Sequence, residues 1–311
     1  MKAIVLKEAG NVENLEYVEL QKPTISSGQV LVKVKAISIN PVDVKSRAGK
    51  GVYGRIKTEN PLILGWDIAG IVEETQSSDF KVGDEVFGMI NFPGHGKAYA
   101  EYVAAPANQL ALKPENITFE DAAASTLVAL TAYQALVHNA DVQQGQTVLV
   151  HAASGGVGHI AVQIAKHLGA KVTGTSSAKN KDFVLGLGAD SHIDYHGFDW
   201  GSAGRTFDFV LDTIGGENID HSLEVTKEGG SIISIPTGLN EEVTSKAESK
   251  GVKGYFILVQ SNGEDMKQIA SLLKSGAIKP HVSKTFPFEQ MREAHLEQET
   301  GRTVGKIVIT L

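Results

Sequence analysis

The chain has 311 residues, a formal net charge of −7 at pH 7 and no cysteine. This length is enough for two domains, or for one large domain with a sizeable core. The missing cysteines exclude disulfides, thiolate zinc sites and a cysteine nucleophile. Because no basic block is present, nucleic acid is not an expected partner. No apolar run has the length of a membrane span or a signal peptide, so we expect a cytoplasmic protein with no membrane partner.

The first 115 residues read as mainly β-structure. Val30–Ile39 alternates between apolar residues and lysines, as in a strand with one buried face, and it ends at Asn40-Pro41. A helical turn is predicted at Val42–Arg47, with Lys45 and Arg47 solvated. Ala48–Asn60 is polar and contains glycine, which indicates a mobile loop that carries Tyr53. Further strands are predicted at Met1–Leu6, Leu15–Leu20, Leu62–Val72, Val82–Gly88 and Tyr99–Val103.

The pattern changes at Thr118, which can cap a helix with Asp121 three residues later. The alanine-rich run that follows is predicted to be helical as far as His138. Strands then alternate with helices up to about residue 260, which indicates a doubly wound parallel sheet. The six candidate strands are Thr147–His151, Lys171–Thr175, Ser191–Asp194, Phe209–Asp212, Ser231–Ile235 and Tyr255–Val259.

A glycine turn follows the first of these strands, in Thr147–Leu168. The turn contains Gly155, Gly156 and Gly158, and an apolar stripe at helical spacing comes next. Strand, glycine turn and helix are the opening of a nucleotide-binding βαβ unit, where free N–H groups attract a pyrophosphate. Taken alone, the same pattern also fits a tight turn that binds nothing.

The C-terminal part predicts two helices and one strand. The helices are Glu264–Ser275 and Glu289–Glu299, and glycines follow both. The strand is Gly305–Leu311. Because two helices separate it from the parallel sheet, we expect this strand to return to the first domain.

Several segments together resemble the medium-chain dehydrogenase/reductase superfamily, and most of all its zinc-free quinone oxidoreductase branch. The resemblance implies an α/β protein in which a GroES-like β domain, residues 1–122 and 262–311, accompanies a six-stranded Rossmann domain, residues 123–261. The segments run almost from end to end: Asn40-Pro-Val-Asp43, Gly65-Trp-Asp-Ile-Ala-Gly70, Val82-Gly-Asp-Glu-Val-Phe-Gly88, Tyr99-Ala-Glu-Tyr102, Leu130-Thr-Ala-Tyr133, Ala152-Ala-Ser-Gly-Gly-Val-Gly158 and Gly305-Lys-Ile-Val308.

The sequence departs from the zinc-dependent members of that superfamily. They carry Cys where this chain has Asn40, and Gly-His-Glu where it has Gly65-Trp66-Asp67. A zinc site needs three or four well-placed ligands, so a zinc alcohol dehydrogenase is not expected and no metal is predicted. His192, Asp194 and His196 alternate and can share a strand face. They form either a polar strand end or, as the minor alternative, a metal site.

The second strand predicts which nicotinamide cofactor is used. NAD sites usually carry Asp or Glu about 20 residues beyond the glycine turn. Here Ser176, Ser177 and Lys179 occupy that place, and they suit the 2′-phosphate of NADPH. The same residues also fit a simple helix cap with a solvated lysine. By resemblance, Tyr195 flanks the adenosine phosphate.

Other cofactor contacts follow from the resemblance. Asn40 and Thr131 are expected near the nicotinamide. The pyrophosphate is expected on the glycine turn. Other cofactor-binding residues follow the fourth and fifth strands, at the carboxyl edge where open α/β sheets bind ligands. These residues are Ser154, Gly155, Gly156 and Val157 for the turn, and Thr213, Ile214 and Pro236 for the strand ends.

The predicted chemistry is hydride transfer from NADPH to a quinone or an α,β-unsaturated carbonyl compound. Negative charge then grows on the carbonyl oxygen, and the protein must stabilise it. Tyr53 is the candidate hydrogen-bond donor beside Asn40, although a tyrosine packed under a loop fits equally well. Asp43 is expected to cap the short helix rather than to act in catalysis.

The expected partners are a small-molecule quinone or enone and a second copy of the chain. The sixth strand, Tyr255–Val259, is apolar enough to pair across a two-fold axis at a sheet edge. Two alternative functions remain open at this point. One is a 2-enoyl thioester reductase, and the other is a non-catalytic NADPH-binding redox sensor or adaptor.

Overall fold

The computed structural model describes residues 1–236, 238–239 and 242–311. Its chain forms two compact units. The terminal unit contains residues 1–130 and 259–311, and the central unit contains residues 131–258. Helix α4 (Leu127–Tyr133) runs across the division between them.

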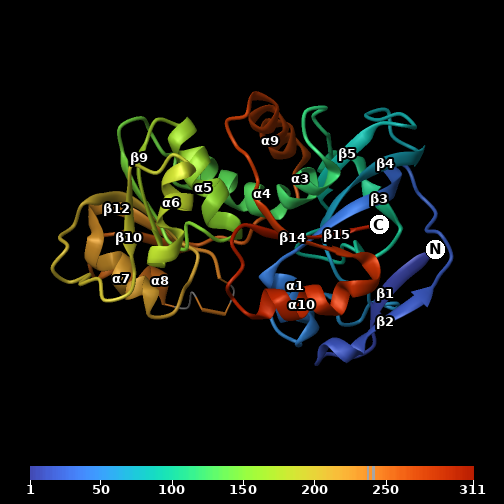
Figure 1. Ribbon diagram of the computed structural model, residues 1–311, viewed down its shortest axis with the longest axis horizontal. Helices are drawn as coiled ribbons and strands as arrows, with labels where there is room; N and C mark the ends of the chain where they lie inside the picture. Colours follow the sequence, from blue (N-terminus) through green and yellow to red (C-terminus); the bar gives the residue numbers. More distant parts are fainter. Residues whose placement is uncertain (237, 240–241) are drawn as a thin grey trace. The chain divides into compact units, whose positions relative to one another are not determined.

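The terminal unit is built around the long strand β3 (Gln29–Ile39), which pairs with β4, β6 and β15. Its seven-stranded sheet has the order β14-β15-β3-β4-β5-β7, with β6 also on β3. The C-terminal strand β15 therefore returns to the first domain, as predicted, and Figure 1 shows it beside β14. The other elements of the unit are β1 (Lys2–Leu6), β2 (Leu15–Glu19), α1 (Pro41–Arg47), α2 (Tyr53–Ile56), β4 (Asp67–Thr75), β5 (Glu85–Met89), β6 (Tyr102–Pro106), β7 (Ala111–Leu112), α3 (Phe119–Ala124), α9 (Gly263–Ser275), β14 (Val282–Pro287), α10 (Met291–Glu299) and β15 (Lys306–Thr310).

The central unit is a six-stranded parallel sheet with the order β10-β9-β8-β11-β12-β13. Strand order therefore reverses between β8 and β11, which is the doubly wound arrangement of dinucleotide-binding domains. This confirms the predicted fold class. The elements are β8 (Thr147–Val150), α5 (Gly156–His167), β9 (Lys171–Ser176), α6 (Lys181–Gly186), β10 (Ser191–Asp194), β11 (Phe207–Asp212), α7 (Asn218–Val225), β12 (Thr226–Ser234), α8 (Val243–Glu248) and β13 (Lys253–Phe256).

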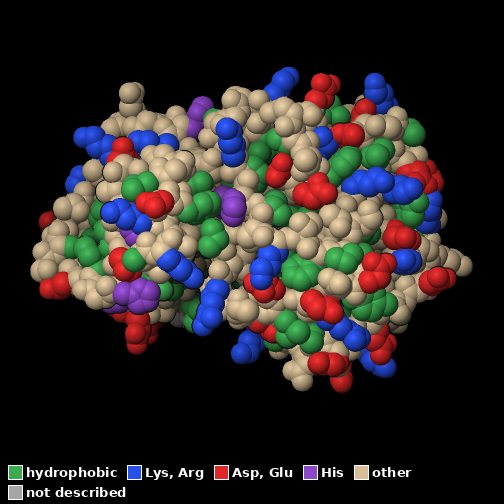
Figure 2. All heavy atoms as spheres, in the orientation of Figure 1, with side chains coloured by type: hydrophobic (Ala, Val, Ile, Leu, Met, Phe, Trp, Pro, Cys, Tyr) green, Lys and Arg blue, Asp and Glu red, His purple; other side chains and the backbone are tan. Residues whose placement is uncertain are grey.

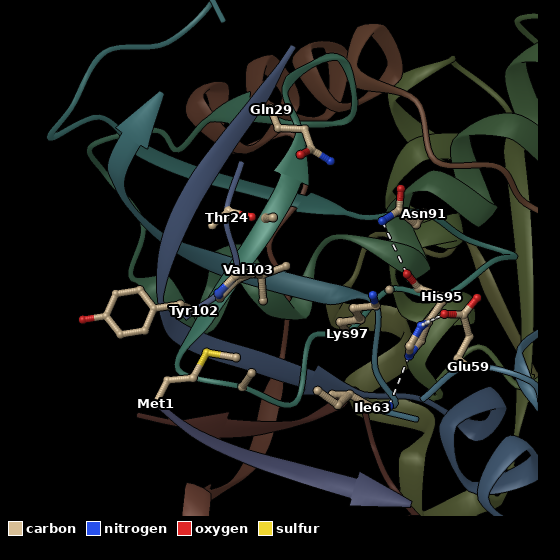
Figure 3. A pocket seen from close by; sticks show the side chains of 14 residues that line it. Met1, Thr24, Gln29, Glu59, Ile63, Asn91, His95, Lys97, Tyr102 and Val103 are labelled. Carbon is tan, nitrogen blue, oxygen red and sulfur yellow. Dashed lines mark hydrogen bonds and ion pairs between the residues drawn. The ribbon is translucent and has the colours of Figure 1, made fainter. Parts of the chain in front are cut away.

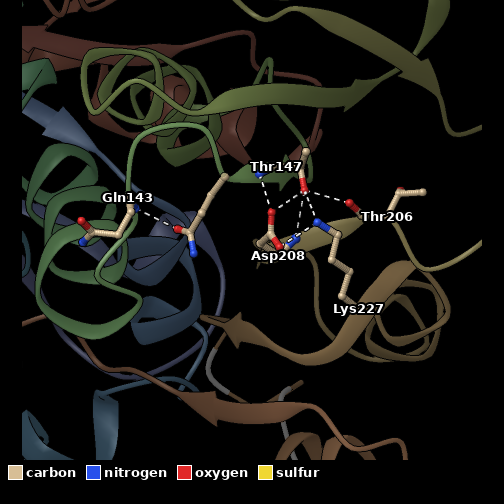
Figure 4. Close-up of polar contacts among 6 residues, drawn as sticks. Gln143, Thr147, Thr206, Asp208 and Lys227 are labelled. Carbon is tan, nitrogen blue, oxygen red and sulfur yellow. Dashed lines mark hydrogen bonds and ion pairs between the residues drawn. The ribbon is translucent and has the colours of Figure 1, made fainter.

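A polar network ties together the amino ends of the two central strands (Figure 4). Thr147 at the start of β8 donates its N–H and its hydroxyl to Asp208 Oδ2, at 2.8 and 2.7 Å. Lys227 Nζ binds the other oxygen of Asp208 at 2.7 Å. The network fixes the relative position of β8, β11 and β12 at the edge opposite to their carboxyl ends.

Three local features differ from the sequence-based expectation. Residues 48–60, expected to be a loop, contain the short helix α2. The alanine-rich helix is broken into α3, α4 and a π-helix at Gln134–Asn139, and β14 was not predicted. The cap at Thr118 is confirmed, because its hydroxyl oxygen accepts the Asp121 N–H at 3.1 Å.

On the face shown in Figure 2, acidic and basic side chains are interspersed. Among the described residues, no helix combines the length and the apolar character needed to cross a bilayer.

Candidate active site

The glycine turn of the central unit is packed directly against the helix that follows it. Gly155 is the N-cap of α5, and Ala152 has a positive φ of 46°. A Cβ on Gly158 would lie 2.2 Å from the Ala152 carbonyl oxygen. Only glycine therefore fits at position 158. The turn can thus bring backbone N–H groups to the carboxyl edge of β8, as pyrophosphate binding requires.

Two hydrogen bonds connect this turn to its neighbours. Ser154 Oγ accepts from Asn180 Nδ2 at 3.1 Å, which joins the turn to the segment after β9. His151 Nδ1 lies 3.2 Å from Thr175 Oγ1 on β9. Burial of the His151 ring lowers its pKa to about 4, so it is neutral at physiological pH.

The end of β9 carries the hydroxyl group of Ser176, and Ser177 and Lys179 follow it directly. Ser176 Oγ donates to the Ser177 carbonyl at 3.1 Å and lies 2.8 Å from His192 Nε2 on β10. Lys179 is exposed in the turn Ala178–Asn180. Tyr195 is 49% exposed, and its ring stacks on His196 with centroids 4.1 Å apart.

The candidate metal ligands on β10 have other partners. His192 bonds Ser176, and His196 Nδ1 lies 3.0 Å from Asp194 Oδ1. Within the described ranges, no three His, Cys, Asp or Glu side chains converge as a metal site would require. These contacts match the interpretation of a polar strand end.

The segment after β11 is held by a buried carboxylate. Asp212 Oδ1 accepts the N–H groups of Ile214 and Gly215, each at 3.0 Å, and Asn218 Nδ2 at 2.9 Å. Ser234 of β12 donates to Asp212 Oδ2 at 2.8 Å, which ties together the ends of the fourth and fifth strands. The segment therefore has a fixed shape with Ile214 exposed.

Three other predicted cofactor-binding residues also belong to the central unit. Thr213 directs its hydroxyl to the His151 carbonyl at 2.8 Å. Pro236 lies half-buried just beyond β12. Thr131 is buried on α4.

The terminal unit contains a buried ionic cluster around Asn40. Lys306 Nζ donates to Asn40 Oδ1 at 2.5 Å and to the Ile39 carbonyl at 2.6 Å. Asn40 Nδ2 donates to Asp67 Oδ2 at 2.8 Å. The amide of Asn40 therefore bridges an ammonium group and a carboxylate, and all three side chains are buried.

Further donors stabilise the Asp67 carboxylate. Ser38 Oγ donates to Asp67 Oδ2 at 2.9 Å, and the Leu127 N–H donates to Oδ1 at 3.1 Å. Burial still raises the pKa of Asp67, while the charge of Lys306 opposes that shift. Burial lowers the pKa of Lys306 to about 8.

A second branch of the cluster runs through Asp43. The Asn40 N–H donates to Asp43 Oδ2 at 2.8 Å, which confirms Asp43 as part of the cap of α1. Tyr99 donates its hydroxyl to Asp43 Oδ1 at 3.0 Å and lies 2.9 Å from His295 Nε2. Burial, followed by the charge of Asp67, raises the pKa of Asp43 to about 7. The sequence reading missed Lys306, Tyr99 and His295.

Three side chains in or near α1 are at least partly buried. Tyr53 begins α2 and is half-buried, so it stays a candidate donor. Arg47 was expected to be solvated, which is wrong: it is 4% exposed and its guanidinium bonds the Gly10 carbonyl and Glu299. Lys45 is also partly buried, and burial lowers its pKa.

A separate hollow of about 350 Å³ lies within the terminal unit (Figure 3). At one end, His95 Nδ1 lies 3.0 Å from Glu59 Oε2, and His95 Nε2 accepts the Ile63 N–H at 3.1 Å. Burial lowers the pKa of His95, while the nearby Glu59 opposes that shift. Tyr53 and Asn40 are not among the residues that line this hollow.

The central unit has the doubly wound sheet of dinucleotide-binding domains, and the terminal unit is a β domain that contains both chain ends. Residues 26–115 match the family model of the alcohol dehydrogenase GroES-like domain, and residues 187–309 match that of zinc-binding dehydrogenase. The chain belongs to the medium-chain dehydrogenase/reductase family, in its quinone oxidoreductase-like branch.

Individual relatives agree with this assignment. The chain is 35% identical to 2-methylene-furan-3-one reductase of Solanum lycopersicum, over 99% of this chain and 79% of that protein. It is 34% identical to the NADPH-dependent alkenal/one oxidoreductase of Arabidopsis thaliana, with the same coverage. The solved quinone oxidoreductase of Coxiella burnetii is 36% identical with a TM-score of 0.94, over 100% of this chain and 99% of that one. The Escherichia coli quinone oxidoreductase solved with NADPH is 29% identical with a TM-score of 0.88, over the full length of both chains.

Proposed function

We propose that this protein is an NADPH-dependent, zinc-independent reductase of quinones or α,β-unsaturated carbonyl compounds. The relatives that support the acceptor class are named as quinone oxidoreductases and as alkenal or furanone reductases. NADPH is the cofactor, as in the Arabidopsis relative and in the solved Escherichia coli structure. When bound, NADPH supplies the hydride.

The main support for independence from zinc is the Asn40 side chain, whose amide is hydrogen-bonded to both Lys306 and Asp67. By the resemblance, zinc-dependent family members have Cys at the position of Asn40 and Gly-His-Glu at the positions of Gly65-Trp66-Asp67. Here a buried ammonium group donates to the side-chain oxygen of Asn40 and offsets the charge of Asp67, which accepts from the Asn40 amide. Trp66 at the intervening position directs its indole N–H to the Gly94 carbonyl at 2.6 Å. A cation is thus already built into the fold, and the donor set does not fit a zinc ion.

The residues of the central unit fit the cofactor. The backbone N–H groups of Gly155, Gly156 and Val157 would hold the pyrophosphate, beside Ser154. No carboxylate stands at the end of β9, where an NAD site would carry one, so Ser176, Ser177 and Lys179 can bind the 2′-phosphate, with Tyr195 beside it. Thr131, Thr213, Ile214 and Pro236 would hold the nicotinamide end.

The terminal unit supplies Asn40 and Tyr53 to the reaction. Hydrogen bonds to the oxygen and the nitrogen of its amide hold the Asn40 side chain in place. We propose that Asn40 lies near the nicotinamide and takes part in positioning the acceptor. Tyr53 is the proposed donor to the acceptor's carbonyl oxygen, where negative charge develops. Because solvent can protonate the product carbon, a protein acid is not required, and loss of the Tyr53 hydroxyl should slow rather than abolish turnover.

We also propose a homodimer. Strand β13 (Lys253–Phe256) lies at the edge of the parallel sheet, where its free side can pair with the same strand of a second copy. Gel filtration at several concentrations tests this proposal, because a monomer at every concentration would contradict it.

An acceptor series tests the proposed function. The purified protein is given NADPH with a benzoquinone, a naphthoquinone, an alkenal, a cyclic enone and an enoyl thioester. Fast turnover with a quinone or an enone is the predicted result. Preference for the thioester would move the assignment to an enoyl thioester reductase, which the 28% identical CurK enoyl reductase structure makes a real competitor. NADPH binding without turnover of any acceptor would indicate a sensor or adaptor.

A further inference from the structure

His192 lies beside the proposed 2′-phosphate site but has no role in the assignment above. Its strand β10 pairs in parallel with β9, and its Nε2 lies 2.8 Å from Ser176 Oγ. Ser176 has a single hydroxyl proton, and the structure directs it to the Ser177 carbonyl at 3.1 Å. While the serine proton is directed there, the contact with His192 is a hydrogen bond only in the tautomer that carries the ring proton on Nε2.

This arrangement decides what Ser176 can offer to a ligand. With Nε2–H as the donor, the serine keeps its own proton and can turn it from the Ser177 carbonyl to a phosphate oxygen. With the opposite tautomer, the serine would donate to the imidazole and present only lone pairs, which repel an anion. A protonated imidazole keeps the Nε2–H and adds a positive charge beside the phosphate.

The charged groups around His192 are few. Asp194 lies on its own strand and accepts His196 Nδ1 at 3.0 Å, so a second histidine faces that carboxylate. Lys181 begins α6, and Lys179 lies in the turn before it. On β9, the one charged residue is Lys171, at the opposite end of the strand.

We propose that His192 is the positioning residue that makes Ser176 a donor to the 2′-phosphate of NADPH, and that it takes up a proton when the phosphate binds. The inference rests on the proposed function, because it assigns the 2′-phosphate to the end of β9. Partial burial and Lys181 lower the pKa of the free imidazole while Asp194 raises it. A phosphate dianion close by would raise that pKa, which couples binding to protonation.

The test uses two adenosine fragments that differ only in the 2′-phosphate. Calorimetry measures the binding of 2′,5′-ADP and of 5′-AMP to the full-length protein, in buffers of different ionisation enthalpy, from pH 6 to 8. The wild type should prefer 2′,5′-ADP and take up a fraction of a proton with it, but not with 5′-AMP. The preference should fall as the pH rises.

Two variants separate the contributions. His192→Phe removes the donor, and we expect about a tenfold loss of affinity for 2′,5′-ADP with 5′-AMP unchanged. His192→Gln keeps an N–H donor without a titrating group, so it should restore most of the affinity at pH 8. It should also reduce the proton uptake and the pH dependence to the part that comes from titration of the 2′-phosphate itself. His167→Gln is the matched control, because His167 is exposed in the last turn of α5 and should behave as wild type.

The other outcomes are also distinguishable. Equal losses for both fragments in His192→Phe would show a merely structural role and overturn the inference, as would no loss for either. If the wild type binds 5′-AMP as tightly as 2′,5′-ADP, the assignment of the 2′-phosphate itself fails, and with it the NADPH preference in the proposed function.

Discussion

Lys306 Nζ lies 2.5 Å from Asn40 Oδ1, although the two residues are 266 positions apart in the chain. The last strand of the protein thus supplies the cation that orients the first candidate active-site residue. The same amide bonds Asp67 through its nitrogen, so its orientation is fixed from both ends. The pairing of β15 with β3 therefore also brings Lys306 to the side chain of Asn40 and orients it.

Replacing Lys306 with Met should destabilise the protein by about 3–5 kcal/mol, because it leaves the Asp67 carboxylate buried without its cation. Urea unfolding would measure the loss. Adding Asp67→Asn to Lys306→Met removes the stranded charge and should recover a large part of the stability. If the double variant is as unstable as the sum of the two single variants, the two charges do not interact as described.

The stability of the protein should also depend on pH through His295. Burial lowers the His295 pKa from 6.5 to about 3, so between these values the unfolded chain binds more protons than the folded one. The contribution of neutral His295 is therefore complete above pH 6.5 and is lost as the pH falls toward 3. His295→Gln keeps a donor to Tyr99 without titrating. Between pH 4 and 6, the unfolding free energy of this variant should fall less steeply with decreasing pH than that of the wild type. The two slopes should differ by about 1.4 kcal/mol per pH unit. Parallel curves for the two proteins would contradict this account.

Gly158→Ala should abolish tight NADPH binding, because the new Cβ would lie 2.2 Å from the Ala152 carbonyl oxygen and force the turn open. Gly186→Ala is the matched control: it lies in α6 with nothing within 4 Å of the added methyl group. Alanine there should be neutral or slightly stabilising. NADPH fluorescence titration and thermal unfolding of both variants check the prediction. Wild-type affinity in Gly158→Ala would show that the turn is not a cofactor site.

Ser176→Ala combined with Lys179→Ala should raise the KM for NADPH more than the KM for NADH. Loss of two donors to a charged phosphate oxygen is expected to shift the ratio by roughly ten- to a hundredfold. Steady-state kinetics with both cofactors measure it. Equal changes for NADPH and NADH would exclude these residues from 2′-phosphate recognition.

The regular parts of the fold could be predicted from the sequence. Apolar runs and glycine turns located all six strands of the parallel sheet, and Ser191–Asp194 even had the observed bounds. Local signals were sufficient for the central strands β8 and β11, because most of their residues are buried and they read as apolar runs. The edge strand β14 was missed because Val282–Pro287 is mostly exposed and has no apolar pattern.

The buried ionic cluster around Asn40 could not be predicted from local sequence patterns. Arg47 looked like a solvated residue of a short helix, but tertiary contacts with Gly10 and Glu299 bury it. Lys306 did leave one signal, since a lysine heads the apolar run Ile307–Ile309 on a strand expected to join a sheet. Asp67 is distant in sequence and begins β4, so Lys306 and Asp67 come together only because β15 and β4 both pair with β3.

The most direct test of the account is NADPH oxidation by protein from which metals have been stripped by a chelator. With a quinone or an enone as acceptor, turnover should be unchanged by stripping and by added zinc, and NADPH should be used in strong preference to NADH. Activity that disappears on stripping and returns with zinc would contradict the account, because it would place a metal where the structure has the ammonium group of Lys306.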